Sequence, residues 1–222
     1  MAAALALPFA FIPLFGVTAL LNNDQFKQNV FGKDSKPKDI QHTKLMALAG
    51  TAAPIAMLYA RASRGVSVRF LPLTLLGAAL KTVGIFGSAQ AVLAPNPMMD
   101  VFLNGQTRTS WGAHNTKPEG LVRVTRHPLS FSVAAYSVGN LITRFSPTDM
   151  IFWTGVGAFS VFHAYLEDKA NKPVLGEAFY NQTSFTPFQA IREDRQKIAD
   201  VKAEIHEKAI AFTTLASPLF LL

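Results

Sequence analysis

The chain has 222 residues, of which 50% are hydrophobic and only 16% are charged. Because soluble domains usually carry about 25% charged residues, this composition indicates an integral membrane protein. The formal net charge of +7 does not indicate nucleic-acid binding, because the basic residues stand between the apolar segments, where membrane topology puts them. The absence of cysteine excludes disulfides, thiolate metal sites and cysteine nucleophiles.

Six apolar segments are long enough, or nearly so, to cross the roughly 30 Å of a bilayer's hydrocarbon core as helices. In chain order they are residues 2–22, 45–60, 70–93, 128–143, 150–166 and 205–222. The last segment is short, since its uncharged part begins at Ala209, and it either spans the membrane or lies in the interface. The predicted fold is therefore an all-α transmembrane bundle of five to six spans, in a single domain over residues 1–222.

The basic residues between these segments predict an orientation. Linkers 22–44, 94–127 and 167–208 contain 5, 4 and 7 Lys and Arg residues, whereas the termini and the other two linkers contain 4 together. The positive-inside rule places the three basic linkers in the cytoplasm, matrix or stroma and the N-terminus on the opposite side. The membrane-surface linker 167–208 also includes residues 197–208, whose alternating charges predict a solvated surface helix.

An arginine-rich turn precedes the fourth apolar segment. Arg123, Arg126 and His127 stand just before Pro128. Two guanidinium groups there could bind a lipid head group or a haem propionate, and the imidazole could bind a metal or transfer a proton. Alternatively, the arginines anchor a helix end among lipid phosphates, and His127 caps nearby backbone carbonyls.

A second histidine, His163, lies near the same-side end of the fifth segment and could approach His127. Two imidazoles facing each other across helices could hold a haem, whereas a single intramembrane histidine often makes only an interhelical hydrogen bond. Glu167 and Asp168 follow on the same helix. Paired acids can act in general acid–base catalysis, but at a helix end they are more often surface charges.

Lys81 is the only charged residue well inside an apolar segment. We expect an acidic group of a partner subunit to neutralise it, with snorkelling or a cage of carbonyls as alternatives. Small residues recur in the second, third and fifth segments, for example at Gly50, Gly77 and Gly155. Small residues let helix backbones approach closely, so these segments favour tight helix packing.

Two blocks of sequence carry a family resemblance. The first is Gly-Leu-Val-Arg-Val-Thr-Arg-His-Pro at 120–128, and the second contains Asp168, Gly-Glu-Ala-Phe at 176–179, Thr-Ser at 183–184 and Pro-Phe at 187–188. Together they resemble the NnrU family of membrane proteins, which includes 15-cis-zeta-carotene isomerase. The resemblance covers residues 120–197, with a shorter match at 45–60. It implies a multi-helix membrane protein and, in the isomerase branch, a haem b held by histidines that acts on a carotenoid.

The resemblance also implies that three of the family's histidines are replaced. Thr18, Asn140 and Leu166 stand at their positions, while His127 keeps the histidine of the Arg-His-Pro motif. Threonine, asparagine and leucine are not the axial ligands that haem iron normally takes. His163 lies three residues from the last of these positions, so it could form a relocated haem-binding pair with His127.

The sequence therefore predicts an accessory structural subunit of a larger organellar membrane complex, respiratory or photosynthetic, that lacks isomerase activity. Its expected partners are other membrane subunits and phospholipids, with no nucleic acid, and its expected location is an organellar inner membrane, mitochondrial in preference to plastid. No cofactor is expected in this case. The alternative prediction is a haem b-dependent 15-cis-zeta-carotene isomerase. A membrane methyltransferase is a third possibility, but no acidic-aromatic cofactor block supports it.

Overall fold

The computed structural model describes residues 2–32, 36–62, 70–104 and 117–216, and the regular elements within these ranges are helices. In chain order they are α1 (Ala2–Leu21), α2 (Asp24–Phe31), α3 (Pro37–Arg61), α4 (Leu71–Leu93), α5 (Pro97–Asn104), the 3₁₀ helix η2 (Gly120–Arg123), α6 (Pro128–Thr143), α7 (Pro147–Gln182), α8 (Gln189–Arg192), α9 (Ile198–Ala203) and α10 (Glu207–Ala216). The predicted all-α class is confirmed.

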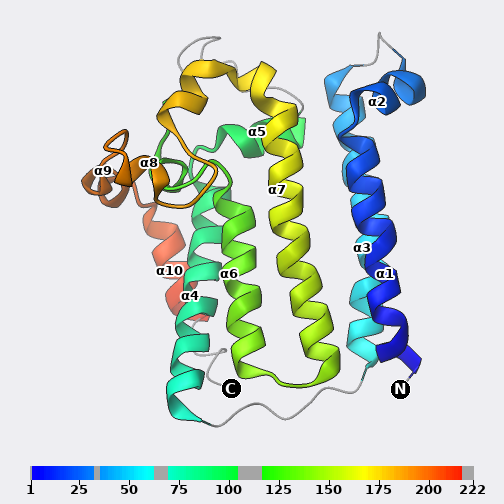
Figure 1. Ribbon diagram of the computed structural model, residues 1–222. Coiled ribbons are helices and arrows are strands. Elements are labelled where there is room, and N and C mark those ends of the chain that lie inside the picture. The colour runs from blue at the N-terminus through cyan, green and yellow to red at the C-terminus, as the bar shows by residue number, and fades with distance from the viewer. Residues whose placement is uncertain (1, 33–35, 63–69, 105–116, 217–222) are drawn as a thin grey trace.

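The long helices lie side by side as a bundle (Figure 1). Helix α4 packs against α6, α6 packs against α7, and α1 packs against both α3 and α7. Helix α10 runs along α4. The short helices α2, α5, α8 and α9 gather at one end of the bundle. These four belong to the three basic linkers, so the linkers that the charge pattern groups on one side do meet at one end.

The structure supports fewer membrane spans than the sequence predicts. Among the described residues, α3 and α4 are long and apolar enough to cross a membrane, and α1 with α2 forms a third candidate that is bent by 83°. The predicted count of five to six spans is not confirmed. Helix α6 has only 16 residues, whereas a perpendicular span needs about 20. Residues 217–222 of the predicted last span lie outside the described residues.

Glycines hold α4 and α6 in close contact. An added Cβ atom at Gly77 would lie 2.9 Å from the carbonyl oxygen of Gly139, and one at Gly139 would lie 2.7 Å from that of Gly77. Only residues without a side chain allow two helix backbones to approach this closely. The predicted role of small residues in tight packing therefore applies to this helix pair.

Lys81 lies in this same helix interface. It is only 6% exposed, and its Cγ atom would lie 2.9 Å from a Cβ atom added at Gly139. In this structure the bundle itself buries the Lys81 side chain. Its neutralisation by a partner subunit stays a prediction.

Several helices begin or end at residues that differ from those predicted by the sequence pattern. Helix α7 continues through the predicted end at residue 166 and bends at Gly176, whose φ of 79° lies in the left-handed region. The predicted surface helix over residues 197–208 is broken, because α9 ends at Ala203 and α10 begins at Glu207. Both differences bring polar residues of the 167–208 linker over the end of the bundle, where the candidate site lies.

Candidate functional site

The two sequence blocks that define the predicted motif pack directly against each other. The backbone amide of Arg126 donates to the carbonyl oxygen of Ser184 at 2.8 Å, and that of Phe188 donates to the carbonyl oxygen of Val124 at 2.9 Å. The Thr125 hydroxyl donates to the carbonyl oxygen of Phe185 at 2.7 Å. Two segments about sixty positions apart in sequence are therefore hydrogen-bonded to each other next to the N-terminus of α6, and we call this contact the joint.

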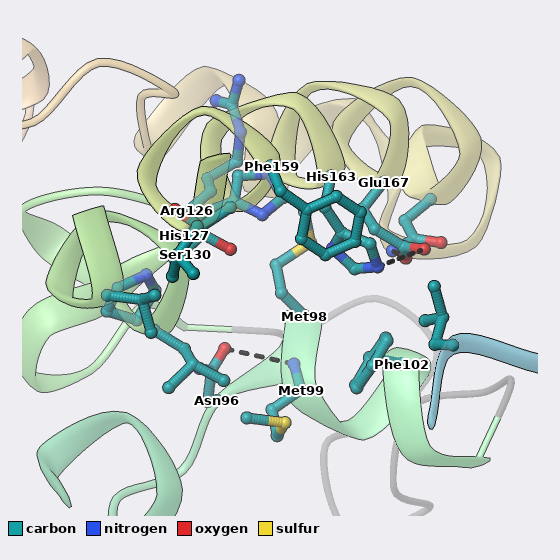
Figure 2. A pocket seen from close by; sticks show the side chains of 17 residues that line it. Asn96, Met98, Met99, Phe102, Arg126, His127, Ser130, Phe159, His163 and Glu167 are labelled. Atoms are coloured by element: carbon teal, nitrogen blue, oxygen red, sulfur yellow. Dashed lines mark hydrogen bonds and ion pairs between the residues drawn. The ribbon is translucent and has the colours of Figure 1, made fainter. Parts of the chain in front are cut away.

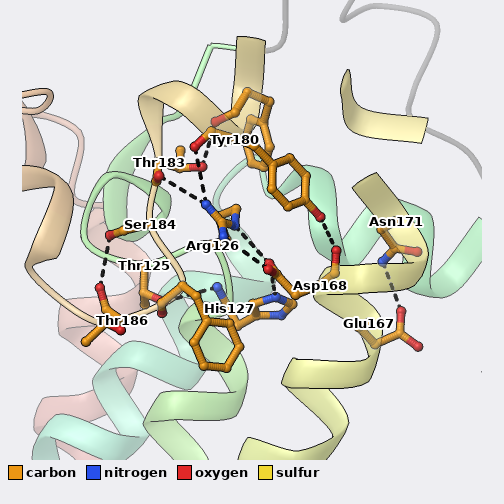
Figure 3. Close-up of polar contacts among 12 residues, drawn as sticks. Thr125, Arg126, His127, Glu167, Asp168, Asn171, Tyr180, Thr183, Ser184 and Thr186 are labelled. Carbon is orange, nitrogen blue, oxygen red and sulfur yellow. Dashed lines mark hydrogen bonds and ion pairs between the residues drawn. The ribbon is translucent and has the colours of Figure 1, made fainter. Parts of the chain in front are cut away.

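Arg126, His127 and Asp168 form the centre of this joint, which we call the clamp (Figure 3). The Arg126 guanidinium donates to the two oxygens of Asp168, from Nε at 2.8 Å and from Nη2 at 3.1 Å. His127 Nε2 lies 2.9 Å from Oδ1 of the same carboxylate and is therefore the protonated nitrogen that donates. Burial acts to raise the pKa of Asp168, but hydrogen bonds from His127 and Arg126 outweigh it and hold that pKa below its usual value.

The bend of α7 brings the residues that follow Gly176 into contact with the clamp. After Gly176 the chain turns back, so that the Tyr180 ring lies 4.3 Å from the Arg126 guanidinium carbon. The Tyr180 hydroxyl donates to the Asp168 carbonyl oxygen at 2.5 Å, and burial raises its pKa. Arg126 Nη1 donates to the carbonyl oxygen of Thr183 at 3.0 Å. All three guanidinium nitrogens of Arg126 are thus engaged within the chain.

Arg123 is engaged in the same way by Gln196, which precedes α9, and by the segment between α9 and α10. Its Nε and Nη2 atoms donate to the two oxygens of Glu204 at 2.8 and 2.6 Å, and Nη1 donates to Gln196 at 2.6 Å. The backbone amide of Gly120 also donates to Glu204, at 2.6 Å. The hydrogen bond from Arg123 is the main reason that the pKa of Glu204 is low. Gln90 of α4 fastens this segment to the bundle by accepting from the His206 amide at 2.9 Å.

A second pair of charged side chains is buried on a neighbouring face of α7, about 100° around the helix from Asp168. Lys44 of α3 forms an ion pair with Glu167, and each side chain is 5% exposed. Asn22 accepts a hydrogen bond from Lys44 at 2.9 Å, and Asn171 donates one to Glu167 at 2.9 Å. His163 Nε2 lies 3.8 Å from the Glu167 carboxylate. Glu167 is therefore not the surface charge that its position at a helix end predicted.

A cavity of about 260 Å³ lies between these two charged groups. Its wall is mainly apolar, with Phe159 on α7 facing Met98, Met99 and Phe102 on α5 (Figure 2). The polar side chains around it include Arg126, His127, His163 and Glu167, together with Asn96, Ser130, Ser160 and Asn171. The structure thus brings His127 and His163 to one cavity, as the sequence suggested.

Three described residues where the resemblance implies replaced histidines, Thr18, Asn140 and Leu166, do not line this cavity. Thr18 and Asn140 are buried, and each side chain bonds to a carbonyl of its own helix, at Leu14 and Tyr136, over 2.7 and 3.0 Å. Leu166 does not line the cavity either, within the described residues. These positions serve helix packing in this chain.

The geometry does not fit a haem held between the two histidines. His127 uses Nε2, the nitrogen that most often binds iron, to donate to Asp168. The cavity is also smaller than the roughly 300–1,000 Å³ of pockets for drug-sized ligands, and a haem is larger than such ligands. Among the described residues, no group of three or more His, Asp or Glu side chains could hold another metal ion.

The sequence indicated the arginines, the histidines and the acids Glu167 and Asp168, but not which of these groups bind one another. Glu204, Tyr180 and Lys44 were not singled out for the site. Only one local signal was available, namely that Glu167 follows His163 by four positions, which puts both on one helix face. The other partners lie 42 to 123 positions away from the residue they bind, where no periodicity links them.

Comparisons with known proteins give no relative for this chain. No family model matches it, and neither the curated proteins nor the solved structures contain a significant match. The resemblance to the NnrU family therefore stays a prediction, and the argument for function depends on the site and the surface of the protein.

Proposed function

We propose that this chain is a structural subunit of a larger membrane complex in an organellar inner membrane. A respiratory complex of mitochondria is favoured over a photosynthetic one. The observation that carries the proposal is an exposed face of small residues on α3, formed by Ala49, Gly50, Ala52, Ala53 and Ala56. An added Cβ atom at Gly50 would meet no atom within 4 Å. Such faces let a helix of another chain pack closely in lipid.

The contrast with α4 supports this assignment. The glycines of α4 are buried against α6, so they serve the internal packing of this chain. The single glycine of α3, Gly50, and the alanines around it face outward, flanked by Met46 and Met57, which are 75% and 60% exposed. Lipid alone requires no small residues at such positions. A helix of a neighbouring subunit would use them.

The clamp supports a structural role as well. Arg123 and Arg126, the residues expected to bind a lipid head group, instead bind Glu204 and Asp168 of the same chain. With these donors engaged, a phosphate would have to displace a carboxylate from each guanidinium. The motif joins the linkers to the bundle, and we do not propose a head-group site at Arg123, Arg126 and His127.

The native size of the chain tests this proposal. We expect the tagged protein, extracted from its own membrane in mild detergent, to migrate with an assembly of several hundred kilodaltons. Gly50→Leu should release it as a small particle, because the new side chain occupies the space of the partner helix. Gly16→Leu is the matched control, since Gly16 is also exposed on its helix with no atom within 4 Å of an added Cβ. Migration of the unaltered protein as a small particle that isomerises a cis-carotene would disprove the proposal.

The alternative is the haem b-dependent cis–trans isomerase, and one observation supports it. His127 and His163 line the same cavity. If either histidine binds haem, replacing it with alanine should abolish the Soret band of the purified protein. An absorption spectrum without a Soret band in the unaltered protein would remove this alternative.

A further inference from the structure

We propose that the cavity beside the clamp binds the hydroxyl-bearing head of a neutral membrane lipid, with His163 as the hydrogen-bond acceptor. This site is independent of the α3 face. Three features indicate which ligands the cavity can bind. They are its apolar wall, the pairing of its charged side chains and the hydrogen bonding of His163.

The charge balance indicates a neutral ligand. Two charged side chains line the cavity, Arg126 and Glu167, and each is paired with an opposite charge, Asp168 and Lys44 respectively. The lining therefore offers no uncompensated charge to an ionic ligand. Burying an ion without a counter-charge is strongly unfavourable, so an anionic or cationic head group would be excluded.

His163 determines what the ligand must offer. Within the described residues neither of its ring nitrogens makes a hydrogen bond, and Nε2 is completely buried. Nε2 is also the nitrogen that faces the Glu167 carboxylate, at 3.8 Å. This distance is too long for a hydrogen bond but short enough for the negative charge to favour a proton on Nε2. Nδ1 then carries the lone pair and can accept a hydrogen bond from a ligand that enters the cavity.

The aromatic neighbours hold this ring in place. Phe102 contacts His163 edge-on with ring centres 5.3 Å apart, and Phe159 lies at 5.8 Å. Both phenylalanines also line the cavity, together with Met98 and Met99. Flexible thioethers adapt to ligands of different shape, and aromatic edges favour a flat or compact apolar body. A hydroxyl group on such a body satisfies Nδ1 while the rest of the head stays in apolar contact.

The volume agrees with a head group and not with a whole lipid. The volume of the cavity is about 260 Å³. It lies just below the roughly 300–1,000 Å³ of pockets that enclose a drug-sized ligand. A long tail would therefore extend out of the cavity. Two kinds of lipid have this chemistry, aromatic quinols and aliphatic acylglycerols.

The experiment uses the purified protein in detergent with three probes, a decyl-substituted benzoquinol, its oxidised quinone and dioctanoylglycerol. Binding is measured as the rise in melting temperature and by titration calorimetry. We expect at least one hydroxyl probe to bind, and the one that binds better identifies the source as quinol or acylglycerol. The quinone should bind more weakly than the quinol, because its carbonyl oxygens cannot donate to Nδ1.

Two variants make the test specific. His163→Phe keeps a ring but removes the acceptor, and it should weaken the binding of the hydroxyl probe roughly three- to tenfold, as expected for one hydrogen bond. His42→Phe, at an exposed position of α3 outside the cavity, is the matched control and should bind normally. Val133→Trp fills the cavity and should abolish binding even if His163→Phe folds poorly. Absence of binding by both hydroxyl probes, equal binding of quinone and quinol, or full binding by His163→Phe would each overturn the proposal.

Discussion

Replacing Asp168 with asparagine tests whether the clamp stabilises the fold. The Arg126 and Asp168 side chains are only 10% and 17% exposed, and the carboxylate accepts hydrogen bonds from Arg126 at 2.8 and 3.1 Å and from His127 at 2.9 Å. Asparagine keeps the shape and one acceptor oxygen but removes the charge. It thus leaves the Arg126 guanidinium buried without a counter-ion.

The size of the effect follows from this geometry. Removing one partner of a buried ion pair costs about 3–5 kcal/mol, and the remaining acceptor and the partial exposure of Asp168 reduce this to about 2–3 kcal/mol. For chains of 150–250 residues, 1 kcal/mol lowers the melting temperature by about 2–4 °C. We therefore expect Asp168→Asn to melt about 4–12 °C below the unaltered protein in the same detergent, followed by tryptophan fluorescence.

Glu177→Gln is the matched control for this measurement. It makes the same change from acid to amide in an ion pair with Lys172, but the two side chains are 70% and 49% exposed. An exposed pair contributes between about 0 and 1 kcal/mol, so this variant should melt within about 4 °C of the unaltered protein. Equal melting temperatures for Asp168→Asn and Glu177→Gln would refute the reasoning, because the clamp would then contribute no more than a surface pair.

Three further predictions follow from the same contacts. The pKa values of Asp168 and Glu204 lie below their usual values of 3.8 and 4.5, so the two carboxylates contribute fully to stability above these values. Their contribution is lost as the pH falls through the lowered pKa values. The melting temperature, measured as a function of pH, should therefore fall steeply below about pH 4, and a melting temperature that does not change with pH would contradict this. Gly176→Ala should cost about 1–2 kcal/mol, because the φ of 79° is unfavourable for a residue with a Cβ atom, and hydrogen exchange should rise in the segment that carries Tyr180. Gly84→Leu should prevent folding while Gly50→Leu does not, since an added Cβ at Gly84 would lie 2.7 Å from the Ser132 carbonyl oxygen, and soluble expression in detergent separates the two.

The sequence predicted the start of a helix correctly where a proline or a capping residue marks it. The apolar segment 128–143 corresponds to α6 (Pro128–Thr143), which begins with proline at a position where its missing N–H is not needed. Helix α7 begins in a similar way, since the Ser146 hydroxyl accepts from the Asp149 amide at 3.0 Å and caps the helix. The number of spans was not predictable in this way. A short apolar helix such as α6 is equally suited to burial among other helices, and hydropathy does not separate the two cases.

The charged partners could not be predicted because their positions depend on helix rotation and tertiary packing. Glu167 and Asp168 are neighbours in sequence, and both were read as surface charge. Consecutive residues on a helix point about 100° apart, so Glu167 faces Lys44 of α3 while Asp168 faces Arg126 on a neighbouring face of α7. The chain separation of these pairs is 123 and 42 residues. Only the packing of α7 between two groups of helices assigns each acid its partner.

The two histidines show how this packing separates residues that the sequence treats as equivalent. His127 and His163 were both candidates for a ligand at the same cavity, and both do line it. His127, however, already donates to Asp168, which is held by Arg126, so changing its bond would disturb the whole clamp. His163 makes no hydrogen bond within the described residues, and an acid lies 3.8 Å from one of its nitrogens. A ligand therefore gains most by bonding to His163, whereas His127 belongs to the structure that holds the cavity in place.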